Sequence, residues 1–130
     1  MHAATPLISV VDDDLPVRRA LRRLIQAAGY TVETFASARE FLEASPLGRT
    51  SCLVLDIHLD GMSGFELAEQ LAADRAAIPI IFITAHDDTP TRTRATRAGV
   101  AAYLPKPFDE RVLLDAIRSA LGADHGRSTS

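Results

Sequence analysis

The residues best suited to chemistry are acids that end short apolar runs, together with one lysine. Asp12 and Asp13 follow the first such run, and Asp56 follows the third. Thirteen of the fourteen basic residues are arginine, and the remaining one, Lys106, lies between two prolines. A lysine ammonium is a compact point charge on a flexible stem, whereas arginine presents a planar fork. The exception suggests that this ammonium must reach the acids; the alternative is an arginine-biased composition with one lysine left by chance.

Carboxylates that crowd together repel one another, so either some are protonated or a cation lies among them. Ligands that offer only oxygen suit Mg²⁺, and no histidine or cysteine cluster has the spacing of a zinc site. With its charge balanced, one carboxylate can attack phosphorus and form an aspartyl phosphate. Such a transfer needs positioning and charge neutralisation at the phosphoryl oxygens, which Mg²⁺, Lys106 and the hydroxyl of Thr84 would supply.

The positions of the acids indicate their roles. Asp12 and Asp13 are adjacent, so at the end of a strand they point in different directions and suit metal binding, directly or through water. Asp56 stands alone on a central strand with an approachable carboxylate. We therefore predict that Asp56 is the phosphoryl acceptor.

Short strand-like runs alternate with longer helix-like segments, and these elements must position the acids. The apolar runs are 7–11, 31–36, 52–57, 78–85 and 101–104. Helical periodicity or a capping signal marks 17–28, a segment that opens at Ser37, 65–72 and 112–121, and 89–99 is expected to be a further helix without large apolar residues. Runs that are apolar throughout indicate strands buried on both faces. Five strand–helix units predict an α/β fold with a doubly wound parallel sheet in three layers, whose ligands gather at the carboxyl ends of the strands.

The bulk composition fits a single globular domain. The 130 residues are 47% hydrophobic and 24% charged, and the net charge of −3 leaves no broad basic surface for nucleic acid. One cysteine excludes an internal disulfide, and no apolar stretch has the length of a membrane span or the form of a signal peptide. These features predict a cytoplasmic protein. We expect residues 1–122 to form the domain, with the last helix ending at Gly122, and 123–130 to be a disordered tail or the start of a linker.

The ordered motifs resemble the receiver (response-regulator, CheY-like) domains of two-component signalling, and FixJ-type receivers most of all. The matching segments are 10–14, 55–57, 61–64, 83–86, 98–99 and 106–108. The resemblance covers about Leu7 to Leu121 and implies a flavodoxin-like three-layer sheet of five strands in the order 2-1-3-4-5. It also implies a phosphorylation-activated switch that modifies itself and turns over no external substrate.

Residue by residue, the resemblance implies that a histidine kinase, a phosphotransfer protein or a small phosphodonor phosphorylates Asp56. Asp12 and Asp13 would hold Mg²⁺ together with Asp56 and the backbone carbonyl of His58. A homodimer could form on phosphorylation, and neither nucleic acid nor a membrane is an expected partner.

Four further residues complete the implied machinery. Thr84 and Lys106 would bind the phosphoryl group, and the Lys106–Pro107 bond is expected to be cis. Tyr103 would act with Thr84 as the aromatic switch; the alternative is an ordinary aromatic on an edge strand. His86, like His58, lies two residues beyond a site residue. The two histidines could tune the lifetime of the phosphate or could be exposed residues with no kinetic role.

Two other protein classes could use the same residues. A haloacid-dehalogenase-like phosphatase also uses a strand-end aspartate with Mg²⁺, but it expects a second acid where His58 stands. A flavodoxin-type carrier needs a phosphate loop after the first strand, where Asp12 to Asp14 would repel phosphate.

Segment 89–99 has only Ala95 and Ala98 as anchors, which predicts a weakly held helix; alternatively, it is an ordinary solvated face.

Overall fold

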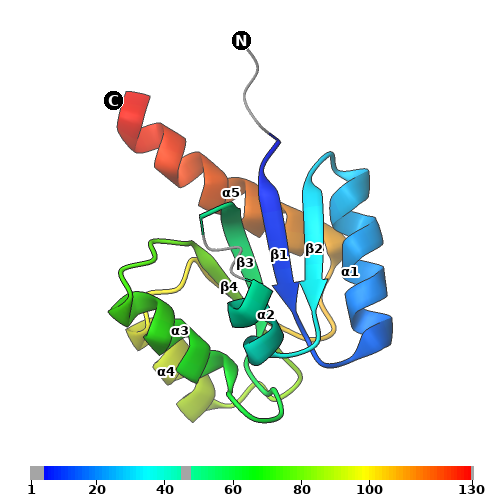
Figure 1. The fold of residues 1–130 in the computed structure, drawn as a ribbon, viewed down its shortest axis with the longest axis vertical. Helices are drawn as coiled ribbons and strands as arrows, with labels where there is room; N and C mark the ends of the chain where they lie inside the picture. Colours follow the sequence, from blue (N-terminus) through cyan, green and yellow to red (C-terminus); the bar gives the residue numbers. More distant parts are fainter. Residues whose placement is uncertain (1–4, 45–47, 130) are drawn as a thin grey trace.

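The computed structural model describes residues 5–44 and 48–129, with side chains described as far as residue 122. Five parallel strands form one sheet in the order β2-β1-β3-β4-β5 (Figure 1). The strands are β1 (Leu7–Val11), β2 (Thr31–Phe35), β3 (Thr50–Asp56), β4 (Ile80–Thr84) and β5 (Ala102–Pro105). The helices are α1 (Leu15–Ala27), α2 (Ala38–Ala44), α3 (Gly64–Ala73), α4 (Thr89–Arg97) and α5 (Glu110–Thr129). The predicted strand order and element sequence are confirmed.

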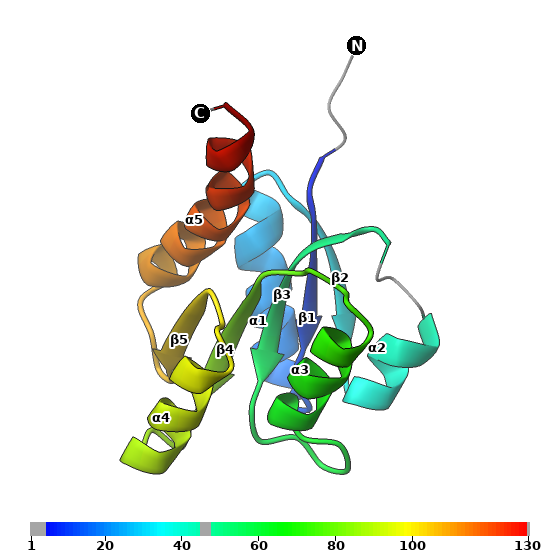
Figure 2. The ribbon, with the colours of Figure 1, turned by 90° about the vertical axis from the view of Figure 1, so that its left-hand side faces the viewer.

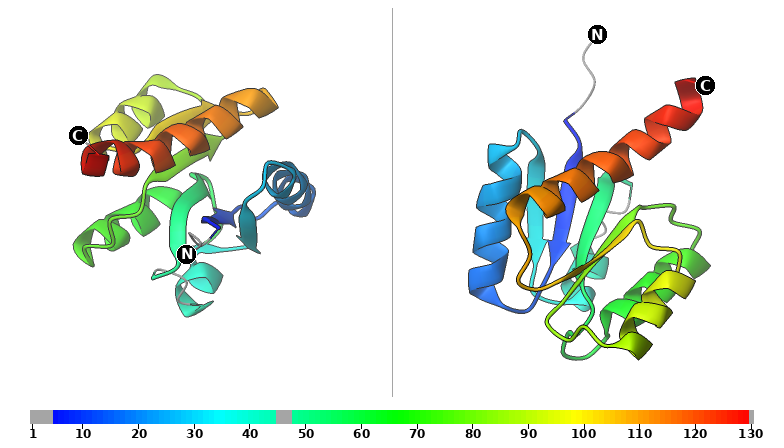
Figure 3. Two further views of the ribbon diagram at one scale, coloured as in Figure 1. Left: turned by 90° about the horizontal axis from the view of Figure 1, so that it is seen from above. Right: turned by 180° about the vertical axis from the view of Figure 1, so that it is seen from behind.

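Helices cover both faces of the sheet, as the apolar runs predicted. Cys52 and Val54 of β3 belong to the core cluster that contains residues of α1 and α5, whereas Leu53 and Leu55 belong to the cluster that contains residues of α2, α3 and α4. This alternation is the two-residue period of a strand. Figure 2 shows α2 and α3 on one side of the sheet, and Figure 3 shows α5 crossing the face that also carries α1. The predicted three-layer architecture is therefore confirmed.

A capping box begins α3 and orders the loop that follows β3. The Ser63 hydroxyl accepts a hydrogen bond from the Glu66 amide at 3.1 Å, and the Glu66 carboxylate accepts one from the Ser63 amide at 2.8 Å. These reciprocal bonds satisfy two amides that the helix itself leaves unpaired. The capping box thus fixes the backbone where the loop after Asp56 joins α3.

The single cysteine, Cys52, is completely buried in β3. Burial in apolar surroundings raises the pKa of its thiol to about 12, although a hydrogen bond with the Leu53 backbone acts in the opposite direction. The thiol is therefore protonated at neutral pH and behaves as a small core residue.

Two expectations about the helices are wrong in detail. Helix α5 continues to Thr129, whereas the sequence predicted its end at Gly122. A glycine inside a helix costs about 1 kcal/mol but does not stop it unless the backbone turns left-handed or proline follows. In α4, Ala95 is buried but Ala98 is exposed, so one residue rather than two anchors the helix. Among the described residues, no helix is both long and apolar enough to cross a membrane.

Candidate functional site

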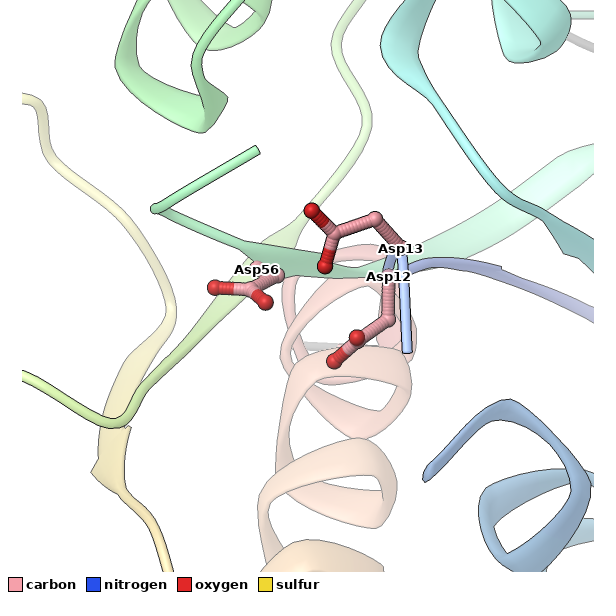
Figure 4. A group of neighbouring side chains, drawn as sticks. All are labelled: Asp12, Asp13 and Asp56. Carbon is pink, nitrogen blue, oxygen red and sulfur yellow. The ribbon is translucent and has the colours of Figure 1, made fainter. Parts of the chain in front are cut away.

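The predicted acids lie together at the carboxyl edge of the sheet. Val11 pairs with Leu55 in the parallel register between β1 and β3, which places the following residues, Asp12 and Asp56, next to each other. Carboxylate oxygens of Asp12, Asp13 and Asp56 lie within 4.8 Å of one another, and Figure 4 shows the three side chains converging. Asp12 and Asp13 extend to different sides of the chain that carries them, as their adjacency predicted.

Lys106 joins two of these acids across the edge of the sheet. Its Nζ lies 2.8 Å from Oδ2 of Asp12 and 3.3 Å from Oδ2 of Asp56, with 19% of the side chain exposed. Burial lowers the pKa of the ammonium, but the hydrogen bond to Asp12 and the charges of both acids outweigh it, so the pKa is raised overall. The Lys106–Pro107 bond is cis, as expected. Lys106 thus forms hydrogen bonds with Asp12 and Asp56, two of the acids that the sequence predicted it to reach.

The fold opposes ionisation of the Asp56 carboxyl by raising its pKa. Only 5% of the residue is exposed, and Oδ1 accepts a hydrogen bond from the His58 amide at 3.0 Å. Burial raises the pKa of this carboxyl, the charge of Asp12 raises it further, and the bonds from His58 and Lys106 only partly compensate. A buried carboxylate with a raised pKa is typical of functional sites.

The donor set fits Mg²⁺. Three aspartates supply only oxygen ligands, and Lys106 offsets one of their negative charges, so a divalent cation would balance the remainder. Neither His58 nor His86 belongs to the three-residue cluster found among the described side chains, so these ligands do not resemble a zinc site.

Thr84 and the two histidines adjoin this edge through backbone contacts. The buried Thr84 hydroxyl accepts a hydrogen bond from the His86 amide at 2.9 Å, and the Thr84 carbonyl accepts one from the Lys106 amide at 2.6 Å. The exposed rings of His58 and His86 meet edge to face, with centroids 4.7 Å apart. Sequence reasoning placed both histidines near the site but not in contact with each other.

Tyr103 lies on β5, and its hydroxyl contacts Asp87. The hydroxyl donates to Oδ1 of Asp87 at 3.0 Å, and the ring packs in part against the core. Two neighbours of the site were missed from the sequence, Asp87 and Arg18. Arg18 donates from Nη1 to the Asp12 carbonyl at 2.7 Å. Arg18 lies six residues after Asp12, which is not a helical spacing, so nothing in the sequence indicates this contact or pairs Asp87 with Tyr103.

Gly64 allows α3 to approach the backbone of the acceptor strand. A Cβ at this position would lie 2.8 Å from the Ile57 Cα and would overlap the Asp56 carbonyl oxygen. Because both obstacles are backbone, Gly64→Ala is expected to lower the free energy of unfolding by about 1–3 kcal/mol, the usual cost of overpacking. Urea denaturation measures this loss. Gly48→Ala, whose Cβ would meet nothing within 4 Å, is the matched control, and an equal effect of both substitutions would contradict the close approach.

The sequence of the chain matches a known family of domains. The profile of the response regulator receiver domain matches residues 8–118. Nodulation protein W of Bradyrhizobium diazoefficiens is 44% identical over 93% of this chain and 53% of its own length. Transcriptional regulatory protein FixJ of Azorhizobium caulinodans is 40% identical over 92% of this chain and 58% of its own length. The chain thus spans about half the length of these curated relatives.

Solved structures agree with the sequence matches. The response regulator StyR is 51% identical and superposes with a TM-score of 0.87 over 97% of this chain and 64% of its own. The structure titled FixJ-N is 35% identical, with a TM-score of 0.84 over 92% of this chain and 96% of its own. Neither the phosphatase nor the flavodoxin alternative is supported. The resemblance to FixJ-type receivers is confirmed, and the chain belongs to the receiver domain family of the response regulators of two-component systems.

Proposed function

We propose that this receiver accepts a phosphoryl group on Asp56. The observation that carries the proposal is the buried Asp56 carboxylate, which shares one ammonium with Asp12 at the carboxyl edge of the sheet. Receiver domains of response regulators interact with histidine kinases or phosphotransfer proteins, so the donor is the phosphohistidine of such a partner, or a small acyl phosphate. In this proposal, residues 1–122 form the receiver domain that accepts the phosphoryl group.

The metal-binding residues in this proposal are Asp12, Asp13, Asp56 and the backbone carbonyl of His58. Receiver domains generally bind Mg²⁺ at an acidic pocket, and when bound it neutralises charge on the phosphoryl oxygens. An Asp56 oxygen attacks phosphorus, forming a P–O bond, while the donor's own bond to phosphorus breaks. In a phosphohistidine this is the P–N bond, whose electron pair remains on the imidazole nitrogen; in an acyl phosphate it is the P–O bond, whose electron pair remains on the leaving carboxylate. The carboxylate must be ionised to attack, and Mg²⁺ held by these residues would offset the burial that raises its pKa.

Two side chains of the protein stabilise the transferred group. Lys106 is already 3.3 Å from Asp56. When the Asp56 carboxylate becomes an acyl phosphate and loses its charge, the Lys106 ammonium turns to a phosphoryl oxygen. The Thr84 hydroxyl donates to a second oxygen. Its present bond from His86 uses an acceptor lone pair, so the proton of the hydroxyl remains available.

The phosphorylated form is read out through Thr84 and Tyr103. Phosphorylation adds about two negative charges and several acceptor oxygens at one end of the sheet. Movement of Thr84 toward these oxygens repositions Tyr103 and the surface formed by α4, β5 and α5, which then binds a partner or a second copy of the chain. The protein catalyses its own phosphorylation and slow hydrolysis and turns over no external substrate.

The paired histidines tune the lifetime of the phosphate in this scheme. Their rings are exposed and contact each other beside Asp56 and Thr84, where they restrict the approach of water. His58→Ala and His86→Ala are each expected to speed hydrolysis of the acyl phosphate by more than about 3-fold, but less than the roughly 100-fold of a general acid–base group. Loss of the phosphoryl group over time, followed by intact-protein mass spectrometry, measures the rate. Rates equal to wild type in both variants would assign the histidines no kinetic role.

The proposed function is tested by incubating the protein with acetyl phosphate and Mg²⁺. One phosphoryl group is expected by intact mass, absent when EDTA is added and removed by hydroxylamine, which cleaves acyl phosphates. Peptide mapping should locate it on Asp56. No modification, or a hydroxylamine-stable group on another residue, would overturn the proposal.

A further inference from the structure

Three residues outside the acidic cluster form a closed set of contacts, which we call the Asp87 latch. The Asp87 carboxylate accepts from the Tyr103 hydroxyl at 3.0 Å and from Arg92 at 2.6 Å (Nη2 to Oδ2) and 3.3 Å (Nε to Oδ1). The Arg92 guanidinium also lies over the Tyr103 ring, with its carbon 5.4 Å from the centroid. The latch therefore joins the loop after β4, the first turns of α4, and β5.

The latch keeps one charged group in a fixed place although all its members are near the surface. The hydrogen bond from Arg92, together with that from Tyr103, lowers the pKa of Asp87, so the carboxylate is ionised at neutral pH. A forked pair of bonds from arginine to carboxylate also fixes the orientation of the acceptor. Asp87 thus holds the Tyr103 hydroxyl at a defined position beside α4.

Helix α4 has few other contacts that would hold it. Ala95 is its single buried residue among nine, and Asp88 caps its first turn by accepting a hydrogen bond from the Thr91 amide at 2.8 Å. Because burial contributes little here, side-chain contacts of its charged residues help to position the helix, such as that of Arg94 with Glu69 and the Phe65 ring of α3. The Arg92 contact of the latch is one of these.

Asp87 is also close to Thr84 in the chain, three positions after it. The Thr84 hydroxyl accepts from the His86 amide at 2.9 Å, which anchors the segment that carries Asp87. A movement of this hydroxyl toward a phosphoryl group on Asp56 stretches that bond and displaces the segment. The carboxylate then leaves the Tyr103 hydroxyl.

We propose that Asp87 and Arg92 are positioning residues that hold Tyr103 in its resting arrangement and thereby oppose phosphorylation of Asp56. The inference rests on the proposed function and adds a specific restraint to it. A contact present only in the resting state shifts the equilibrium against the activated state by its own free energy. By linkage, removing it must make a phosphoryl mimic bind more tightly.

Binding of beryllofluoride with Mg²⁺, a mimic of the acyl phosphate, tests the latch. Asp87→Ala and Tyr103→Phe are each expected to tighten binding about 5-fold, at the low end of coupling between sites because the latch is exposed. The double variant should gain little more than either single one, since both remove the same bond. Glu69→Ala is the matched control: it breaks the exposed pair between Glu69 and Arg94 of α4, without touching Tyr103, and should leave binding unchanged.

A second readout reports Tyr103 directly. The chain has two tyrosines, so fluorotyrosine labelling gives two ¹⁹F signals, and Tyr30→Phe assigns them. In the protein without beryllofluoride, Asp87→Ala should move the Tyr103 signal toward its position in the beryllofluoride complex, and Arg92→Gln should do so in part.

The outcomes separate the latch from the proposed function. Wild-type affinity together with an unmoved ¹⁹F signal in Asp87→Ala would overturn the latch while leaving phosphorylation of Asp56 intact. A wild-type protein that fails to bind beryllofluoride would overturn the proposed function and the effect of the latch on phosphorylation. The ¹⁹F comparison without the mimic would still show whether Asp87 holds Tyr103.

Discussion

Replacing Asp56 with asparagine is expected to abolish phosphorylation and, in the same molecule, to stabilise the protein when no divalent cation is present. The amide has no nucleophilic carboxylate oxygen, so acetyl phosphate should leave its mass unchanged. The gain in stability follows from the buried, ionised carboxylate, which the fold disfavours in the absence of metal. We expect the free energy of unfolding to rise by roughly 0.5–2 kcal/mol, the range of most stabilising substitutions.

The pH dependence of this gain has a definite sign. The folded-state pKa of Asp56 is raised, so below the ordinary aspartate pKa this carboxyl is protonated in both states and does not lower the free energy of unfolding of the wild type. As the pH rises through the folded-state pKa, its ionisation lowers that free energy. Asparagine does not titrate, so the difference between variant and wild type should be larger at neutral pH than in acid. Urea denaturation in EDTA at both pH values measures it.

The control for this experiment is Asp60→Asn, which removes an exposed acid from the same loop. It should retain phosphorylation and change the stability by less than about 0.5 kcal/mol, as most surface substitutions do. Continued phosphorylation of Asp56→Asn would show that the acceptor has been assigned to the wrong residue. An unstabilised variant would show that Lys106 compensates the buried charge fully.

Lys106→Arg is expected to be the second most damaging change, although it conserves the charge. The ammonium fits between Asp12 and Asp56 at 2.8 and 3.3 Å, and a planar guanidinium cannot occupy that position without displacing one of the acids. We expect the rate of phosphorylation by acetyl phosphate to fall at least about 100-fold, the effect of losing one donor to the transferred group.

The matched control is Arg111→Lys, an exchange of the same two residue types on the exposed surface of α5. It should phosphorylate at the wild-type rate. Beryllofluoride binding separates two possible defects of Lys106→Arg. Weak binding indicates lost contacts to the phosphoryl group, whereas normal binding indicates a defect confined to the transfer step. A wild-type rate in Lys106→Arg would mean that charge alone, not shape, is required at this position.

The residue pattern was sufficient for the three-layer α/β class and for the contacts between Lys106 and the acids, whereas the strand order came from the family resemblance. In a parallel sheet the carboxyl ends of all strands lie at one edge, so acids that end apolar runs converge there whatever the loops do. Asp12 and Asp56 obeyed this rule because their strands are adjacent. The specific roles of Thr84 and Tyr103 came instead from the resemblance, because a threonine at a strand end and a tyrosine on an edge strand have many structural explanations.

Other features could not be predicted because they depend on side-chain geometry or on weak local preferences. The Asp87–Tyr103 contact joins residues 16 apart on different elements, and their pairing follows only from how the loop after β4 turns. Helix α5 continues past Gly122, contrary to the prediction, because a single glycine weakens a helix without stopping it. The close approach of Gly64 to Ile57 likewise appears only once α3 is placed against β3.

The buried Cys52 makes this receiver convenient for optical work. Only the thiolate reacts with maleimides, and a thiol inside β3 with a pKa of about 12 is neither ionised nor accessible at neutral pH. A cysteine introduced at an exposed position of α4, such as Thr93, can therefore take a fluorescent dye alone, with the native residue left in place. Motion of that helix can then be followed in real time without first redesigning the core.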